Sequence, residues 1–235
     1  MNLFEKNGMH TASGVEVDQG LRSYFLRVYN YMASALIVTG LVAYFASQSE
    51  AFLGMMSGGL RYVVMFAPLV MVLFLSARLH KMSEGAAQAS FWAFSVLMGL
   101  SMFYIFAAYT GTSIARVFFI TAGTFGAMSL YGYTTKRDLS GFGSFLFMGV
   151  IGIIIASIVN YYFQSSAMHR AISVIGVLLF TGLTAYDTQR IKTTYYQIAH
   201  YGGDLGKAAI MGALSLYLDF INLFIMLMNL MGERR

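Results

Sequence analysis

Seven long apolar stretches occupy most of this 235-residue chain. Hydrophobic side chains make up 58% of the sequence and charged ones only 11%, and the mean hydropathy is +0.66. A helix of about 20 apolar residues is long enough to cross the hydrocarbon core of a bilayer. Such a helix also satisfies its own backbone hydrogen bonds there. We therefore expect an all-α, polytopic membrane protein with seven transmembrane helices.

The predicted spans leave no room for a separate soluble domain. They cover residues 29–47, 62–77, 86–109, 113–133, 142–163, 171–186 and 208–230. We expect residues 1–28 to form a cytoplasmic N-terminal tail, residues 29–230 one seven-helix membrane domain, and residues 231–235 a short C-terminal tail. The N-terminal tail lacks the basic start and apolar centre of a cleavable signal peptide.

Basic residues are divided unequally between the two sides of the predicted bundle. Ten of the 15 Lys and Arg residues lie in the N-terminal tail and in the second, fourth and sixth connections, and five lie on the opposite side. Because cytoplasmic loops are enriched in Lys and Arg, we expect the N-terminus in the cytoplasm and the C-terminus outside. The net charge of +5 is scattered over loops, so the lipid bilayer is the expected partner and nucleic acid is not.

Small residues on the fourth and fifth predicted spans indicate where helices can approach closely. They are Ala122 and Gly126 on the fourth span and Gly149 and Gly152 on the fifth. We interpret them as packing positions only.

The last predicted span carries a single charged residue near its middle, Asp219. A carboxylate near the bilayer centre costs roughly 2.5–3.5 kcal/mol on insertion scales, so an acid at that depth indicates a function. Gly212, Ser215, Asp219, Asn222 and Asn229 recur at helical spacing and form one polar stripe. We expect this stripe to face protein or water, with Ser215 and Asn222 supporting the acid.

A second acid, Asp187, follows the sixth predicted span, whereas the other eight acids lie in tails or connections. We expect Asp187 at the cytoplasmic end of its helix and Asp219 roughly 16 Å into the next one. At these positions the two acids need not touch. Burial favours the protonated form of an acid and a nearby Arg favours the ionised form, so a pair of carboxylates with an Arg can change charge near neutral pH.

Arg78, at the end of the second predicted span, is expected on the same side of the membrane as Asp187. An ionised Asp187 would hold Arg78 as a latch between the second and sixth spans, and protonation would release it. Carboxylates that face water are oxygen ligands of the kind calcium takes, so Asp187 and Asp219 are also candidates for a weak calcium site. The chain has no cysteine and four dispersed histidines, and we expect no cofactor.

Three other interpretations of the acids are open. Asp187 can form an interfacial pair with Arg190, three residues on. Asp219 can be a neutral acid, hydrogen-bonded within the bundle, that serves packing alone. An acid in each of two adjacent spans is also typical of intramembrane aspartyl proteases, in which two acids share a proton and activate water. The motif Leu218-Asp219-Phe220 lacks the glycines of those proteases and no Pro-Ala-Leu segment follows, so we expect no enzyme.

The motifs around the two acids are specific when they are taken together. Residues 184–189 read Thr-Ala-Tyr-Asp-Thr-Gln, and residues 213–224 read Ala-Leu-Ser-Leu-Tyr-Leu-Asp-Phe-Ile-Asn-Leu-Phe. Residues 126–138 read Gly-Ala-Met-Ser-Leu-Tyr-Gly-Tyr-Thr-Thr-Lys-Arg-Asp. With these segments the chain closely resembles the Bax inhibitor motif family of seven-helix membrane proteins, and in detail its bacterial inner-membrane branch.

This resemblance implies a bundle with the seventh helix at its centre and a pH-dependent calcium leak as the activity. Asp187 and Asp219 match the family's paired pH-sensing aspartates, and Arg78 matches the family's basic latch residue by position only. We therefore expect a passive, calcium-permeable leak channel of the plasma membrane, which is the inner membrane in a Gram-negative cell. The alternative is an interaction protein that modulates other membrane proteins, such as a membrane protease, with the acids serving folding alone.

Overall fold

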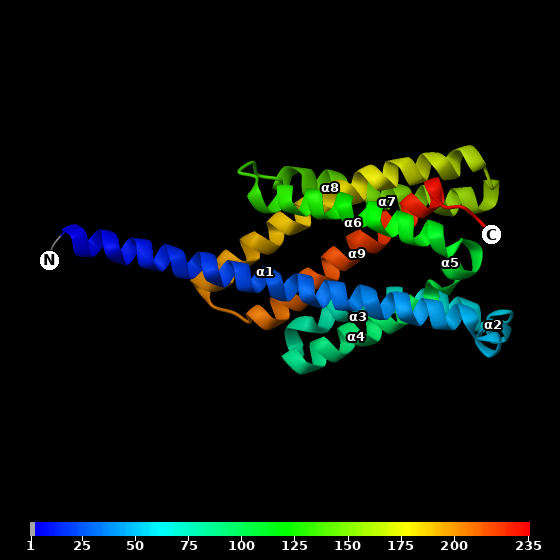
Figure 1. Ribbon diagram of the computed structural model, residues 1–235, viewed down its shortest axis with the longest axis horizontal. Helices are drawn as coiled ribbons and strands as arrows, with labels where there is room; N and C mark the ends of the chain where they lie inside the picture. Colours follow the sequence, from blue (N-terminus) through cyan, green and yellow to red (C-terminus); the bar gives the residue numbers. More distant parts are fainter. Residues whose placement is uncertain (1–2) are drawn as a thin grey trace.

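The computed structural model describes the backbone of residues 3–235 and the side chains of residues 19–79 and 81–235. Within this part of the chain the regular secondary structure is helical (Figure 1). The helices are α1 (Leu3–Gln48), α2 (Glu50–Met56), α3 (Leu60–Arg78), the 3-10 turn η1 (Leu79–Lys81), α4 (Glu84–Ser101), α5 (Phe103–Ala108), α6 (Gly111–Thr134), α7 (Ser140–Phe163), α8 (Ser166–Tyr201) and α9 (Leu205–Met231).

Seven helical stretches in the described residues are long and apolar enough to cross a bilayer, which confirms the all-α, seven-span prediction. The stretches are Gln19–Gln48, Leu60–Arg78, Glu84–Ala108, Gly111–Thr134, Ser140–Phe163, Ser166–Tyr201 and Leu205–Met231. The third combines α4 and α5, and the short α2 lies between the first two.

Two spans extend ten or more residues beyond a predicted end. The first apolar stretch begins at Gln19, within the predicted tail. Residues 1–2 of that tail lie outside the described residues. The sixth continues to Tyr201 instead of ending at residue 186. With 36 residues α8 is about 54 Å long, well above the ~30 Å of the hydrocarbon core, so part of it protrudes from the bilayer. The prediction ended this helix too early because its last turns are polar.

α9 lies at the centre of the bundle, as the family resemblance implied. α1, α4, α6 and α8 all pack against it, and only its last two residues, Leu230 and Met231, are exposed. In Figure 1 this orange-to-red helix runs between α6–α8 on one side and α3 and α4 on the other. A helix that is apolar around most of its circumference is stable where other helices surround it.

A close approach between α6 and α8 occurs at a glycine that was not among the predicted packing positions. Gly132 lies directly against the backbone carbonyl of Ala185 in α8, where a Cβ atom has no space. Of the glycines predicted as packing positions, Gly149 does lie against Leu179 of α8. Gly126 and Gly152 instead face open space, so the packing interpretation was wrong for these two.

Candidate functional site

The two membrane acids are both buried on helices that pack against each other. Asp187 in α8 is 7% exposed and Asp219 in α9 is 5% exposed. Because α8 continues beyond Asp187, this acid lies well inside its helix rather than at the end where the sequence placed it. The packing of α8 against α9 places both acids in the same helix interface, although their predicted positions did not require this.

Arg190 is the ionic partner of Asp187 in the structure. Its Nη2 atom lies 3.3 Å from Oδ1 of Asp187, one helical turn earlier. The same nitrogen donates a hydrogen bond of 2.9 Å to the hydroxyl of Ser215 in α9. The Arg190 side chain is 48% exposed, so water screens part of its charge. This pair is one of the alternatives that the sequence left open, and it joins α8 to α9 beside the acids.

Arg78 is not part of this cluster. It is exposed in the last turn of α3, and within the described part of the chain no ion pair joins it to Asp187. α3 packs mainly against α4 rather than against α8. The structure therefore does not bring together Arg78 and Asp187, the two residues of the predicted latch. A sixth span that ends at residue 186 places Arg190 in a connection, where the sequence predicts at most an interfacial pair with Asp187.

Asp219 has a buried carboxylate oxygen, Oδ2, with no hydrogen-bond partner among the described residues. Its neighbours on the polar stripe are engaged elsewhere, since Ser215 accepts from Arg190 and the Asn222 amide donates to the Leu218 carbonyl. Ser215 thus belongs to the site, whereas Asn222 satisfies its own helix. An unpaired buried oxygen is costly, and a proton, a water molecule or a cation can relieve that cost.

A chain of hydroxyl groups lies beside the acids and joins three helices. Thr188, which follows Asp187, hydrogen-bonds Ser129 of α6 over 2.9 Å, and Ser129 also hydrogen-bonds Tyr29 of α1. Thr188 in turn donates to the carbonyl of Thr184. Sequence reasoning missed this network, because no spacing rule connects residues that lie on different helices.

A cavity of about 470 Å³ borders the acid site on the side where α8 protrudes. Its wall includes Arg190 and Thr194 of α8, and Asp204, Lys207 and Gly212 at the start of α9. Charged and polar groups therefore extend from this cavity to the ion pair of Asp187. The arrangement places Arg190 where it contacts both the cavity and the acid.

Within the described residues no three His, Asp or Glu side chains gather as a metal site. A calcium ion at the acid pair would have two carboxylates, with Ser215, backbone carbonyls or water as further oxygen ligands. Calcium takes six to eight oxygens in its stable sites. The donor set fits a weak and transient calcium contact better than a resident ion.

Comparison with known proteins places the chain among membrane proteins of bacteria. A family model described as "Inhibitor of apoptosis-promoting Bax1" matches residues 21–235. An uncharacterized protein of Rickettsia prowazekii is 48% identical over 227 residues, which cover 96% of this chain and 95% of that protein. Inner membrane protein YbhL of Escherichia coli strain K12 is 47% identical over 224 residues, 94% of this chain and 96% of YbhL.

Proposed function

The chain belongs to the Bax inhibitor family of membrane proteins, and on that premise we propose that it is a passive, calcium-permeable leak channel controlled by protonation of Asp187 and Asp219. The proposed location is the bacterial inner membrane, which is where the name of the relative YbhL places that protein. In this proposal the N-terminus is cytoplasmic, the C-terminus lies outside, and no catalytic step or cofactor takes part.

The observation that carries the proposal is the unpaired oxygen of Asp219 in the middle of the bundle, one helical turn from Ser215, which Arg190 joins to Asp187. Two ionised carboxylates repel each other in a medium of low dielectric constant. A proton on either acid relieves this repulsion, and so does a divalent cation between them. The same pair can therefore respond to pH and provide a temporary contact for calcium on its way through.

Arg190 takes, in this proposal, the role that the sequence assigned to Arg78. It links Asp187 of α8 to Ser215 of α9 and lies in the wall of the 470 Å³ cavity. Protonation of Asp187 removes the charge that holds the guanidinium, which is then free to turn into the cavity. The contact between α8 and α9 loosens at that point, and the path from the cavity to Asp219 opens.

The test is calcium flux into liposomes that hold a calcium dye, between about pH 6 and 8, where such a pair is expected to titrate. The variants are Asp187→Asn and Asp219→Asn, and the control is Asp138→Asn, an exposed acid in the connection between α6 and α7. We expect a pH-dependent leak in the wild type and in Asp138→Asn, and a flat pH profile in the other two. A thermal melt of each protein checks that it is folded.

Two results would contradict the channel. A wild-type protein that is calcium-tight over the whole range ends the leak proposal. Unchanged pH-dependent flux in a folded Asp219→Asn variant shows that the acid is not the sensor. If that variant also loses co-purifying membrane proteins, the interaction protein that the sequence left as an alternative becomes the better description.

A further inference from the structure

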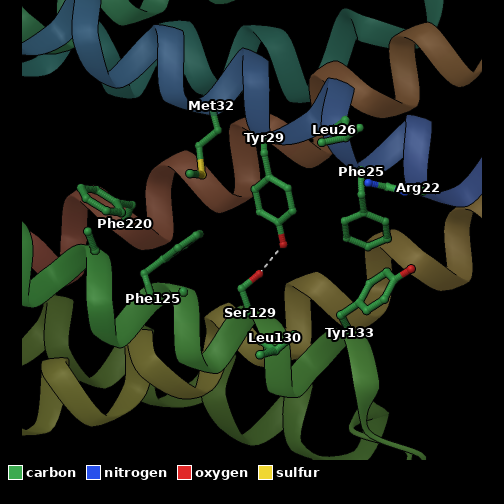
Figure 2. A pocket seen from close by; sticks show the side chains of 12 residues that line it. Arg22, Phe25, Leu26, Tyr29, Met32, Phe125, Ser129, Leu130, Tyr133 and Phe220 are labelled. Atoms are coloured by element: carbon green, nitrogen blue, oxygen red, sulfur yellow. Dashed lines mark hydrogen bonds between the residues drawn. The ribbon is translucent and has the colours of Figure 1, made fainter.

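A groove of about 680 Å³ separates α1 from α6. Both helices pack against α9 and make few close backbone contacts with each other, so the side chains between them leave a gap. Met32, Phe125 and Phe220 line this groove, and Leu26 and Leu130 at its rim are 54% and 64% exposed (Figure 2). We refer to it as the α1–α6 groove. It is apolar and open toward the outer surface of the bundle.

The contacts across the α1–α6 groove show that the two helices run in opposite directions. The ring of Phe25 packs edge-on against Tyr133, with 4.9 Å between the centroids. One turn further along α1, Tyr29 hydrogen-bonds Ser129, which lies one turn earlier in α6 (Figure 2). These two contacts tie the helices together within the groove.

The length of the groove corresponds to one leaflet of a bilayer. On α1 it extends from Arg22 to Met32, about 15 Å at 1.5 Å per residue. The hydrocarbon core is ~30 Å thick, so the groove spans about half of it. Both helices are membrane spans, and their rim residues are exposed and apolar. The groove is therefore open to the hydrocarbon core of the bilayer.

The end of the groove at Arg22 is positively charged. Among the described side chains none forms an ion pair with Arg22, and no acidic residue lines the groove. Lys192 lies at the same end, where its ammonium group is 5.1 Å from the ring centroid of Tyr133 and donates to the Tyr133 carbonyl. Basic groups at the edge of the hydrocarbon core attract the phosphates of anionic lipids.

We propose that the α1–α6 groove binds an anionic phospholipid, with one acyl chain between α1 and α6 and the phosphate at Arg22. This inference concerns binding and does not depend on the calcium leak. The bound chain would contact neighbours of both acids, because Phe220 follows Asp219 and Ser129 hydrogen-bonds Thr188, the residue after Asp187.

The test is a titration of the purified protein with phosphatidylglycerol and with phosphatidylcholine, followed by native mass spectrometry. Gly126→Phe fills the groove, since a side chain at Gly126 has open space in front of it. Its matched control is Gly152→Phe, another glycine with open space, on α7 and outside the groove. For the headgroup, Arg22→Gln is compared with Arg61→Gln, an exposed arginine at the start of α3.

We expect the wild type and both controls to bind phosphatidylglycerol more tightly than phosphatidylcholine. Gly126→Phe should weaken phosphatidylglycerol binding about tenfold or more, because several methylene groups lose their site. Arg22→Gln should weaken it about fivefold, the effect of roughly one basic residue at the membrane surface. Phosphatidylglycerol with a photoreactive acyl chain, added to the wild type, should label Leu26, Met32 and Leu130 preferentially.

Several outcomes would overturn the proposal. No preference for phosphatidylglycerol in the wild type, or an Arg22→Gln variant that retains the preference, excludes the headgroup site. Photolabelling spread evenly over the groove and the exposed face of α7 indicates ordinary boundary lipid. If Gly126→Phe changes the oligomeric state and leaves lipid binding intact, the groove is an interface between two copies of the chain.

Discussion

Arg190 is the residue that distinguishes the acid site in the structure from the one expected from sequence. Three positions after Asp187, it lies on the same face of α8 and reaches both this acid and Ser215. If Arg190 lay in a connection, as the sequence suggested, the direction of its side chain would be undetermined. The continuation of the helix past Asp187 is what gives Arg190 its two partners.

Replacing Arg190 by Gln tests its place in the proposed channel. The ionised acids lose a neighbouring positive charge, so the pH at which the liposome flux changes should move upward. We expect a shift of about 1 pH unit or less, because the guanidinium is half exposed and partly screened. The measurement is the pH profile of calcium flux, with Arg170→Gln, an exposed arginine at the other end of α8, as the control. An unchanged pH profile of calcium flux would show that Arg190 does not control the proposed channel.

At the scale of elements, the contact between α6 and α8 depends on Gly132. The backbones approach closely at Ala185, two residues before Asp187, and the Ser129–Thr188 hydrogen bond lies beside this contact. Only a residue without a Cβ atom allows this distance between the two helices. The position of Asp187 relative to α6 is therefore set by a glycine on another helix.

Gly132→Ala should destabilise the protein by about 1–3 kcal/mol, because the added methyl group has only rigid backbone to displace. Gly126→Ala, on the same helix, is the matched control, since open space faces that position. There the change should be neutral or stabilise the helix by up to about 1 kcal/mol. Thermal melts of the two variants in one detergent give the comparison, and equal melting temperatures would contradict the close contact.

The start of α9 contains an acid whose effect on stability depends on pH. Asp204 caps the helix, with Oδ1 accepting from the backbone N–H of Lys207 at 3.0 Å. This hydrogen bond, with the Lys207 ammonium 3.4 Å from Oδ2, holds the pKa of Asp204 below its usual value. Because the pKa is lower in the folded state, the stabilisation is complete above about pH 4 and is lost as the pH falls through the folded-state pKa.

Asp204→Asn should keep the cap, since an amide oxygen also accepts from the helix, but should lose the titration. We expect its melting temperature to fall less steeply than that of the wild type between about pH 5 and 3. Asp204→Ala, which loses the cap itself, should melt at a lower temperature than the wild type already at neutral pH. Identical slopes for the wild type and Asp204→Asn would show that this carboxylate does not contribute to acid stability.

On the scale of the whole molecule, the orientation in the membrane connects the sequence to the proposed function. An odd number of spans places the termini on opposite sides, and the Lys and Arg bias predicts a cytoplasmic N-terminus. In that orientation the protruding end of α8 and the cavity at Arg190 face the cytoplasm. The proposed leak would then respond to cytoplasmic pH.

The absence of cysteine allows a direct test of this orientation, because each introduced thiol is the only one in the chain. We expect Arg170→Cys and Arg235→Cys to react with a membrane-impermeant maleimide in intact spheroplasts. Lys136→Cys and Tyr201→Cys should react only after the membrane is permeabilised. The reverse pattern would place the cavity outside and make the leak respond to external pH.

The sequence by itself determined the fold class and the number of spans, and it singled out two acids that the structure buries. These follow from local properties, because the length of an apolar run and the cost of a buried charge can be evaluated along one segment. The segments around Asp187 and Asp219 also indicated the family, which the match over residues 21–235 confirmed.

Only the tertiary structure decided how far α8 extends and which arginine pairs with Asp187. It also showed that Gly132, and not Gly126, sets the spacing of α6 and α8. It also revealed the Ser129–Thr188 hydrogen bond and the α1–α6 groove. The physical reason is the same in each case. Apolarity shows that a helix is in the membrane, but the neighbour that a side chain meets depends on packing between segments far apart in the chain.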